Sequence, residues 1–245
     1  MRRTQLRIAA FNVRVGENAS PEAIGHALKP YDLDIVCFSE APAGRWTERA
    51  AAVLRLEHTV VGENTTAGHD DKYKTIASRT PLYAAEEALM ADTLHTATRA
   101  MTDVAGQPIA VYSIHFPFGW RDQAHIDETT GKVTAFVEYL KARPENEVPI
   151  VAGDFNFLLS SEDTVSPYHE MFRGIGMEAS WRDLGTDLSD RCSCGLFKPA
   201  VERAGYVIDH IVYRPSQIRA IEGDIIELPE PMSDHNPVWA HLALK

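Results

Sequence analysis

The segment Ile150-Val-Ala-Gly-Asp-Phe-Asn-Phe157 joins an apolar run to two polar residues that are separated by one position. The run follows Pro149 and ends at Gly153, which predicts a buried strand that stops abruptly. If the backbone is still extended after the run, Asp154 and Asn156 point the same way, because side chains on one face of a strand recur every second residue. The carboxylate would then accept a proton or bind a metal, and the carboxamide would donate a hydrogen bond.

Phe155 and Phe157 point the other way in this interpretation and anchor the turn in the core. A plainer interpretation is that Asp154 and Asn156 are turn residues whose side chains bond their own backbone. The segment by itself favours the plainer interpretation. The rest of the chain favours the chemical one.

Other predicted strands also lead into polar residues of the types that take part in catalysis. Such residues are normal at the end of any one strand, but their repetition predicts that the strands bring them to one rim of a sandwich, where α/β proteins place their sites. The positions are Asn12 after Leu6–Phe11, Glu40 after Asp34–Phe38, His115 at the end of Pro108–His115, Asp209 in Tyr206–Tyr213, and Asp234-His235 just before Asn236–Leu244.

Helical patterns fall between these strands. Ser20-Pro21-Glu22 supplies an N-cap, a first-turn proline and an acidic first turn for a helix that ends at Lys29. Because no repeat, low-complexity tract or Gly/Ser linker marks a boundary, we expect one domain over residues 1–245, an α/β sandwich with mixed sheets. Further helices are expected at Trp46–Leu56, Thr129–Arg143 and Tyr168–Gly174, a further strand at Lys74–Ser78, and an irregular region at Trp181–Gly205.

The composition is that of an ordinary soluble globular protein, with 245 residues, 44% hydrophobic and 24% charged. A net charge of −11 argues against binding nucleic acid by overall charge, since phosphate contacts need basic surface. No apolar run reaches the length of a membrane span, and the N-terminal sequence has no apolar region of the signal-peptide type. Cys37, Cys192 and Cys194 lack zinc-site spacing and are expected to be free thiols in a reducing compartment, which predicts a cytoplasmic location. We also expect a monomer.

Taken together, the motifs resemble the endonuclease/exonuclease/phosphatase superfamily, which has the DNase I-like fold. The resemblance implies a four-layer α/β sandwich of two mixed β-sheets flanked by helices, and a divalent-metal phosphoesterase. Nucleases, lipid phosphodiesterases and phosphatases share the fold, so it does not identify a substrate. The matching motifs are Phe11-Asn12-Val13, Ser39-Glu40, Ser78-Arg79, Ser113-Ile114-His115, Gly153-Asp154-Phe155-Asn156, Ile208-Asp209-His210 and Ser233-Asp234-His235-Asn236-Pro237.

The resemblance assigns a metal site and a general base. Glu40 would be the main metal ligand, with Asn12 and Asp234 beside it, and these oxygen ligands suit Mg²⁺ or Mn²⁺. His235 resembles the general base of the family. Asp209 would orient it, because a carboxylate bonded to one ring nitrogen fixes the tautomer and favours the imidazolium.

The same resemblance places four residues around the reacting phosphate. Asp154 would position the attacking water or share in metal binding. Asn156 would hydrogen-bond a non-bridging oxygen as charge builds in the transition state, and His115 would be a second phosphate contact and an acid for the leaving oxygen. Arg79, at a strand end, would clamp the phosphate.

The segment Phe116–Arg121 directly follows His115 and is expected to overhang the site. Phe118 and Trp120 could stack on bases, grip a small aromatic substrate or touch lipid. Packing of the segment back onto the domain is equally supported, because large aromatic side chains are usually buried.

Three further groups of residues bear on the site: the acids near the first histidine, the basic residues, and the histidines outside the motifs. DNase I-type enzymes pair the first catalytic histidine with a glutamate, and the nearest acids here are Asp70 and Asp71. Lys72, Lys74 and Arg79 form a basic cluster that could serve a phosphate substrate. The histidines that match no motif are expected to be at the surface or internally satisfied; they are His58, His69, His95, His125 and His169.

The sequence therefore predicts a Mg²⁺-dependent phosphoester hydrolase that cleaves nucleic-acid phosphodiester bonds by in-line attack of water. Short or single-stranded substrates are expected, because the chain has no basic stripe for a long duplex. One alternative is a phosphatase or phosphodiesterase acting on a small phosphorylated metabolite or a lipid head group, which the acidic composition favours. Another is a non-catalytic binding module, against which the complete set of catalytic residue types speaks.

Overall fold

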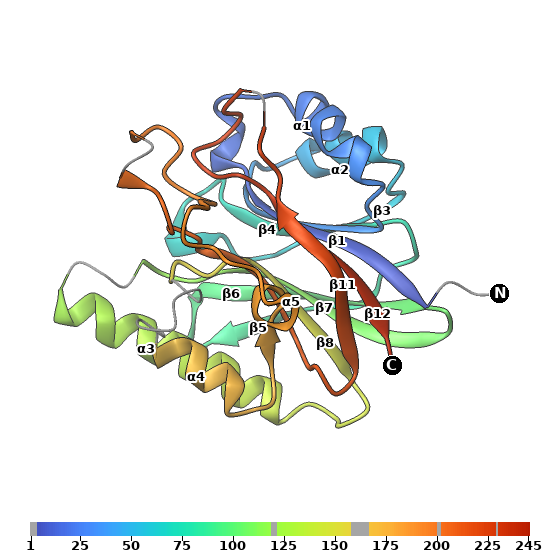
Figure 1. Cartoon of the computed structure of the whole chain (residues 1–245), viewed down its shortest axis with the longest axis vertical. Coiled ribbons are helices and arrows are strands. Elements are labelled where there is room, and N and C mark those ends of the chain that lie inside the picture. Colours follow the sequence, from blue (N-terminus) through green and yellow to red (C-terminus); the bar gives the residue numbers. More distant parts are fainter. Residues whose placement is uncertain (1–3, 119–121, 158–166, 200–201, 229) are drawn as a thin grey trace.

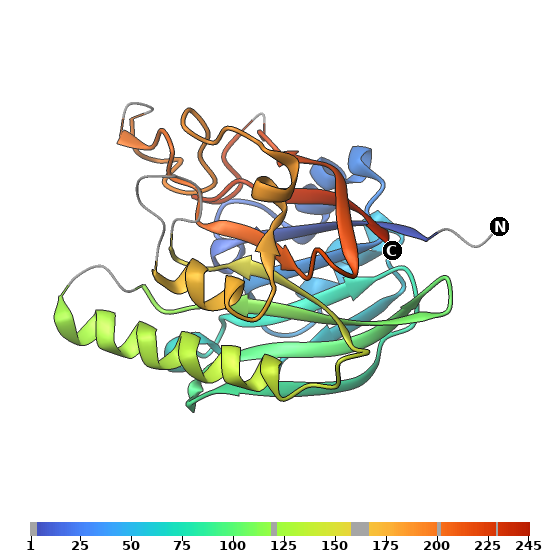
Figure 2. The same ribbon diagram turned by 60° about the horizontal axis from the view of Figure 1, so that its bottom comes forward.

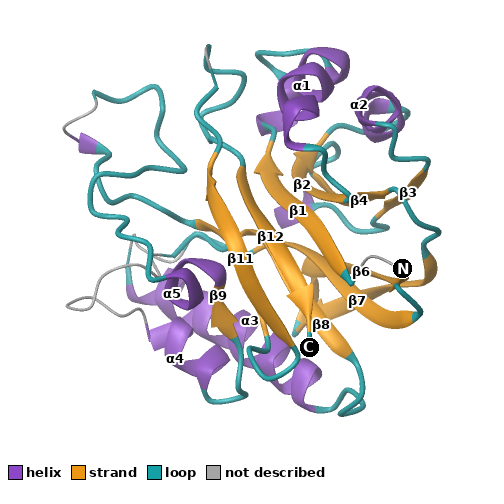
Figure 3. Cartoon of the chain, turned by 45° about the vertical axis from the view of Figure 1, so that its right-hand side comes forward, coloured by secondary structure: helices purple, strands orange, loops and turns teal. Residues whose placement is uncertain are grey.

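The computed structural model describes residues 4–118, 122–157, 167–199, 202–228 and 230–245. Two six-stranded sheets pack face to face (Figure 1), and Figure 3 shows the strands of the first sheet side by side. The first sheet has the order β11 (Ile218–Ile225), β12 (Val238–Leu244), β1 (Gln5–Asn12), β2 (Ile35–Ala41), β4 (Tyr73–Ser78) and β3 (His58–Val61). The second has the order β5 (Tyr83–Met90), β6 (Asp92–Val104), β7 (Gln107–His115), β8 (Val148–Asp154), β10 (Asp209–Tyr213) and β9 (Glu178–Ala179).

Helices cover the outer faces of both sheets. Helices α1 (Pro21–Leu28) and α2 (Trp46–Leu54) lie over the first sheet, whereas α3 (Gln123–Lys141) and α4 (Pro167–Arg173) lie over the second (Figures 1 and 2). This arrangement is the four-layer α/β sandwich that the sequence predicts. None of the described helices is long and apolar enough to cross a membrane. The remaining helices are α5 (Ser180–Leu184) and the 3₁₀ turns η1 (Arg14–Gly16), η2 (Lys29–Tyr31) and η3 (Thr66–Gly68).

Strand β1 shows how the layers are held together, because both of its faces are buried. Leu6, Ile8 and Ala10 belong to the core that includes β7 and β8 of the opposite sheet. Ala9 and Phe11 belong to the core beneath α1 and α2. Burying each large apolar side chain stabilises the fold by about 1.5–3 kcal/mol. A strand buried on both faces reads as a continuous apolar run, which is the pattern found in this part of the sequence.

The strand registers bring the polar strand ends together at one rim. Strands β1 and β2 are parallel, and Asn12 pairs with the residue that precedes Glu40. Strands β7 and β8 are also parallel, and their last paired positions are His115 and Asp154. Strand β10 runs antiparallel to β8 and begins with Asp209 opposite Asp154. The predicted convergence of these residues is therefore a consequence of strand direction and register.

Two helix starts carry the capping interactions that local sequence favours. Ser20 accepts a hydrogen bond from the backbone N–H of Ala23 at 3.2 Å, as expected of an N-cap. Helix α3 begins at Gln123, earlier than the expected Thr129, because Asp122 caps this end with its side chain.

Five strands, β3, β5, β6, β9 and β11, escape the sequence prediction. All of these except β6 lie at sheet edges, where one side of the strand meets water. Strand β5 is exposed along most of its length and carries Glu86 and Glu87 at its centre. The apolar alternation that identifies a half-buried strand is consequently weak there.

Gly153 is required where β8 passes β7. Its φ is +150°, and a Cβ added at this position would collide with the backbone carbonyl oxygen of Ile114. We predict that Gly153→Ala lowers the free energy of unfolding by at least about 3 kcal/mol, because backbone atoms on both strands would have to move. Urea denaturation measures this change.

Gly131 provides the matched control. It lies within α3, and a Cβ there would meet nothing within 4 Å. Gly131→Ala should leave stability unchanged or raise it by about 0.5–1 kcal/mol, because alanine is the better helix former. Equal effects of the two substitutions would contradict the account of Gly153.

Candidate active site

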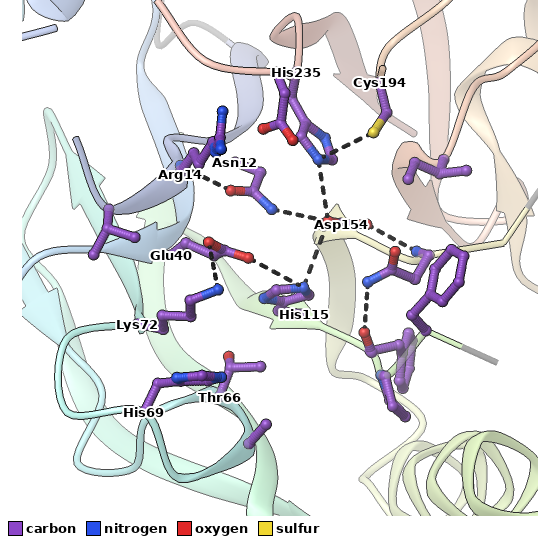
Figure 4. Close-up of a pocket in the computed structure, with 18 of the residues that line it drawn as sticks. Asn12, Arg14, Glu40, Thr66, His69, Lys72, His115, Asp154, Cys194 and His235 are labelled. Carbon is purple, nitrogen blue, oxygen red and sulfur yellow. Dashed lines mark hydrogen bonds and ion pairs between the residues drawn. The ribbon is translucent and has the colours of Figure 1, made fainter. Parts of the chain in front are cut away.

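A cleft of about 980 Å³ opens at the rim where the strand ends meet (Figure 4). The side chains that line it come from both sheets and from the loops that connect them. Those among them that the sequence analysis singles out as site residues are Asn12, Glu40, His115, Phe118, Asp154, Asn156, Asp234 and His235.

Asp154 lies at the centre of this group. Its Oδ2 accepts a hydrogen bond from Asn12 Nδ2 at 2.9 Å and lies 3.5 Å from His115 Nε2 and 3.7 Å from His235 Nε2. Burial raises the pKa of Asp154, the neighbouring histidines lower it, and Asp209 raises it, with a net upward shift. The carboxylate is therefore held by donors and imidazoles, away from bulk water.

Asn156 adopts a turn conformation and does not continue the strand. Its φ is +54°, in the left-handed region that asparagine tolerates, and its backbone N–H donates to Asp154 Oδ1 at 2.9 Å. Its side-chain Nδ2 donates to the carbonyl oxygen of Phe116 at 2.8 Å. The extended backbone assumed for Asn156 is therefore wrong and the turn interpretation describes the backbone, although Asp154 uses only one oxygen for the turn and presents the other to the cleft. Phe155 and Phe157 are buried in the core as expected.

His235 and Asp209 form a buried pair. The distance from His235 Nδ1 to Asp209 Oδ2 is 2.8 Å, so Nδ1 donates and Nε2 faces the cleft. Burial alone would lower the pKa of His235, but the carboxylates of Asp209 and Asp154 outweigh it and raise this pKa well above its usual value. The Sγ of Cys194 lies 3.3 Å from the same Nε2.

Ser233 fixes the turn that carries Asp234 and His235. Its Oγ donates to the carbonyl oxygen of Asn12 at 2.8 Å and accepts from the backbone N–H of His235 at 3.2 Å. These two hydrogen bonds tie the segment before β12 to the end of β1.

Glu40 lies on the opposite side of the cleft from His235 (Figure 4). Its Oε2 is 3.0 Å from Lys72 Nζ, and its Oε1 is 3.9 Å from His115 Nε2. Burial alone would raise the pKa of Glu40, but His115 and Lys72 outweigh it, so the net shift is downward and the carboxyl is ionised at neutral pH.

The residues at this rim fit a hard divalent cation. Glu40 is a partly buried carboxylate with a lowered pKa, and its Oε2 lies 3.0 Å from the Lys72 Nζ. Asn12 and Asp234 add oxygen atoms to the same cleft, and oxygen ligands are those that Mg²⁺ and Mn²⁺ prefer. Asp154, Asp209 and His235 also have ligand atoms within 4.8 Å of one another, but the Asp209–His235 hydrogen bond already occupies Nδ1.

Of the expected substrate-binding residues that the structure describes, Arg79 does not line the cleft. Arg79 bonds Asp32 Oδ1 at 2.8 Å and the carbonyl oxygen of Leu33 at 2.7 Å. Because β4 runs antiparallel to β2, its C-terminal end lies beside the start of β2, far along the sheet from Glu40. The expected role of Arg79 as a phosphate clamp is therefore contradicted. Trp120 lies outside the described residues.

The expected basic cluster does not form either. Lys74 is fully buried and donates to the carbonyl oxygen of Asn64 at 2.7 Å. Burial lowers its pKa to about 8. Lys72 pairs with Glu40, and Arg79 lies at the other end of the sheet. The three side chains therefore do not act together on one phosphate.

The structure adds cleft residues that belong to no recognised motif. Phe118 overhangs the cleft with 44% of its surface exposed, as expected, but His95 is buried within the cleft lining with no hydrogen-bond partner for Nδ1. The expectation that His95 is a surface or satisfied histidine is therefore wrong. No sequence signal marked it, because it lies inside β6, which the sequence did not reveal. Further lining residues of this kind are Arg14, Thr66, His69, Cys194, Lys198 and Tyr206.

Comparison with known proteins gives a consistent family and fold. The profile of the Endonuclease/Exonuclease/phosphatase family matches residues 9–235. The crystal structure of an endonuclease/exonuclease/phosphatase from Beutenbergia cavernae DSM 12333 superposes with a TM-score of 0.78 at 16% identity, covering 100% of this chain and 72% of that chain. No curated protein sequence matches the chain.

Two further similar structures contain nucleic acid. D. rerio TDP2 complexed with single strand DNA product has a TM-score of 0.72 at 15% identity, covering 97% of this chain and 98% of that chain. The 3′ phosphatase NExo from Neisseria, bound to product DNA hairpin, has a TM-score of 0.73 at 18% identity, covering 96% and 98%. At these identities the likeness shows the fold.

The His235–Asp209 pair can be tested in metal-free protein by NMR titration of the ring. We predict that His235 titrates above the ordinary histidine value of about 6.5 and that Asp209→Asn moves this midpoint downward, because an amide no longer stabilises the imidazolium. Asp190→Asn, at an exposed site, should leave the midpoint unchanged. A midpoint at or below the ordinary value in the wild type would contradict the assignment.

Proposed function

Because the chain belongs to the endonuclease/exonuclease/phosphatase family of metal-dependent phosphoesterases, we propose that it hydrolyses phosphodiester bonds of short or single-stranded nucleic acid with the help of Mg²⁺ or Mn²⁺. The observation that carries the proposal is the position of Asp154. Its Oδ2 lies within 3.7 Å of a buried His–Asp pair on one side and 3.5 Å of His115 on the other. Burial lowers the pKa of His115 and favours its neutral ring, so such a site can hold a phosphate between a proton acceptor and a hydrogen-bond donor.

His235 would take the proton of the attacking water. Its Nε2 faces the cleft, and Asp209 holds the ring by Nδ1 and makes the ring more basic, so His235 would act as the base once Nε2 has released its own proton. Asp154, on the same side, orients the water by accepting its other proton.

Asn12, Asn156 and His115 would contact the phosphate itself. Their N–H groups provide donors for the non-bridging and leaving oxygens as negative charge builds. Glu40, Asn12 and Asp234 would hold the divalent ion, which when bound neutralises charge on the phosphate oxygens. His115 lies beside Glu40, across the cleft from His235, on the side where an in-line displacement expels the leaving group.

A second candidate is hydrolysis of a small phosphorylated metabolite or a lipid head group. The net charge of −11 does not favour a long polyanion, and a cleft of about 980 Å³ is of the size that encloses a small ligand. Both candidates use the same residues at the phosphate and differ only in what surrounds it.

The test is a hydrolysis panel with Mg²⁺, Mn²⁺ or EDTA. Its substrates are single- and double-stranded DNA and RNA, a chromogenic phosphodiester and a chromogenic phosphomonoester. Metal-dependent cleavage of single-stranded nucleic acid is the expected result. Cleavage of the monoester alone would select the second candidate, and inactivity on every substrate would contradict the proposal.

The variant His235→Ala identifies the source of the activity. We predict a fall in kcat of about 10²–10⁴-fold with KM largely kept, because a proton acceptor is lost while the phosphate contacts remain. His26→Ala, an exposed histidine on α1, is the control and should retain wild-type kinetics. Equal activity of both variants would show that the cleavage comes from another site or from a contaminant.

A further inference from the structure

The cleft continues past Glu40 and His115 into a polar lobe built around η3. The part of the cleft that is lined by Thr66, His69, Lys72 and His95 is called the η3 lobe below. Figure 4 shows the first three together, on the side of Glu40 and His115 away from His235.

The loop that forms this lobe has a defined shape. The backbone N–H of Thr66 donates to the carbonyl oxygen of Lys72 at 2.9 Å, and the N–H of His69 donates to that of Thr66 at 3.1 Å. The 3₁₀ turn η3 packs against β6, the strand that carries His95. The side chains of the lobe are thus held by the fold and by a closed loop.

Buried polar atoms of this lobe have no partner within the protein. Thr66 and His95 are each only 5% exposed, yet Thr66 Oγ1 and His95 Nδ1 make no hydrogen bond. His115, which borders the lobe and is 7% exposed, also leaves its Nδ1 without a partner. Because buried polar groups are normally hydrogen-bonded, three such atoms along one cleft indicate that a ligand supplies the missing partners.

The chemistry of the lobe suits an anion. A hydroxyl, two imidazoles and an ammonium can all donate hydrogen bonds, and none of the four residues is an acid. Burial, with Lys132 and Lys74, lowers the pKa of His95 to about 4, so at neutral pH its ring is neutral and carries one N–H. Two acids border the lobe and both are paired: Glu40 with Lys72, and Asp92, near His95, with Lys132.

A metal ion fits the lobe less well. Among the described residues, the group of three His, Cys, Asp or Glu side chains whose ligand atoms lie within 4.8 Å of one another is Asp154, Asp209 and His235, and it includes no residue of the η3 lobe. The lobe therefore does not bring three such ligands to one point, whereas phosphate oxygens reach donors that are spread more widely.

We propose that the η3 lobe binds a second phosphate group of the substrate, carried by the leaving group. The placement of this phosphate on the leaving group rests on the proposed function, in which His235 is the base and the leaving group lies on the opposite side of the reacting phosphate. The substrate class is a phosphate ester whose leaving alcohol bears its own phosphate. That phosphate is either the next one of a short oligonucleotide or the second monoester of a small bisphosphate.

The first experiment measures binding and needs no activity. Inorganic phosphate is titrated into metal-free protein while the histidine ring signals are followed by NMR. The signals of His95 and His69 should shift in a saturable way, and Thr66→Val should raise the corresponding Kd by about tenfold, since it removes one hydrogen bond to a charged ligand.

Thr96→Val is the matched control. Thr96 follows His95, is fully buried and also has an unpartnered Oγ1, but it does not line the cleft. It should leave the Kd unchanged. Unshifted His95 and His69 signals, or equal effects of the two variants, would overturn the proposal. If Thr66→Val does not fold, His69→Gln in the exposed loop carries the same comparison.

The second experiment tests whether the second phosphate is carried by the leaving group, and whether it belongs to an oligonucleotide or to a small bisphosphate. For the oligonucleotide source, hydrolysis of the thymidine dinucleotide is compared with hydrolysis of the same dinucleotide phosphorylated at its 5′ or its 3′ end. For the small-molecule source, hydrolysis of propane-1,3-diol bisphosphate is compared with hydrolysis of propyl phosphate. A phosphate on the expelled alcohol should raise kcat/KM by at least about tenfold, and Thr66→Val should remove most of the gain. If kcat/KM rose only when the extra phosphate was on the fragment that keeps the reacting phosphate, the assignment of the η3 lobe to the leaving group would be overturned.

The two experiments separate the two proposals. Saturable phosphate binding without hydrolysis of any substrate would uphold the lobe and contradict the proposed function. Hydrolysis without a shift of His95 and His69 would uphold the proposed function and contradict the lobe.

Discussion

The hydrogen bond from Asn12 Nδ2 to Asp154 Oδ2 joins the two sheets of the sandwich at the floor of the cleft. Asn12 ends β1 in the first sheet, and Asp154 ends β8 in the second. The carboxylate also meets His115 and His235, which approach from β7 and from the turn before β12. A change in the packing of the two sheets would therefore alter the distances between the groups of β1 and the β12 turn and those of β7, β8 and β10.

Burying so many ionisable groups is costly unless each charge has a partner. Asp209 and Asp154 raise the pKa of His235 and so favour its charged form, and His115 and Lys72 lower the pKa of Glu40 and so favour its ionised form. Each group is thus held in its protonation state by neighbours from other strands. This mutual dependence explains how one cleft can contain both a strong proton acceptor and an ionised carboxylate for a cation.

Much of this cleft could be predicted from sequence because most of its candidate residues end, begin or directly precede a buried strand. Apolar runs identify such strands, and strand direction then fixes where their ends lie, as for Asn12 and Asp154. Arg79 shows the limit of this reasoning. It also follows a strand, but β4 runs the opposite way to β2, and strand direction within a sheet is set by packing far along the chain. The resemblance, together with its position after a strand, therefore assigned Arg79 to the wrong end of the sheet.

His95 and Thr66 show a second limit. Both line the cleft, but one lies in a strand with weak apolar alternation and the other in a short 3₁₀ turn, so no local pattern marked either. Their importance lies in the lack of hydrogen-bond partners, which depends on everything packed around them. Such a property exists only in the folded chain.

The central claim is that Asp154 organises one hydrolytic site, and turnover of Asp154→Asn tests it most directly. The amide has the same shape and can still accept from Asn12, so the fold should keep its melting temperature. Loss of the charge between the two histidines should lower kcat by at least about 100-fold, whereas Asp190→Asn at the surface should not. Wild-type turnover by a folded Asp154→Asn protein would contradict the account.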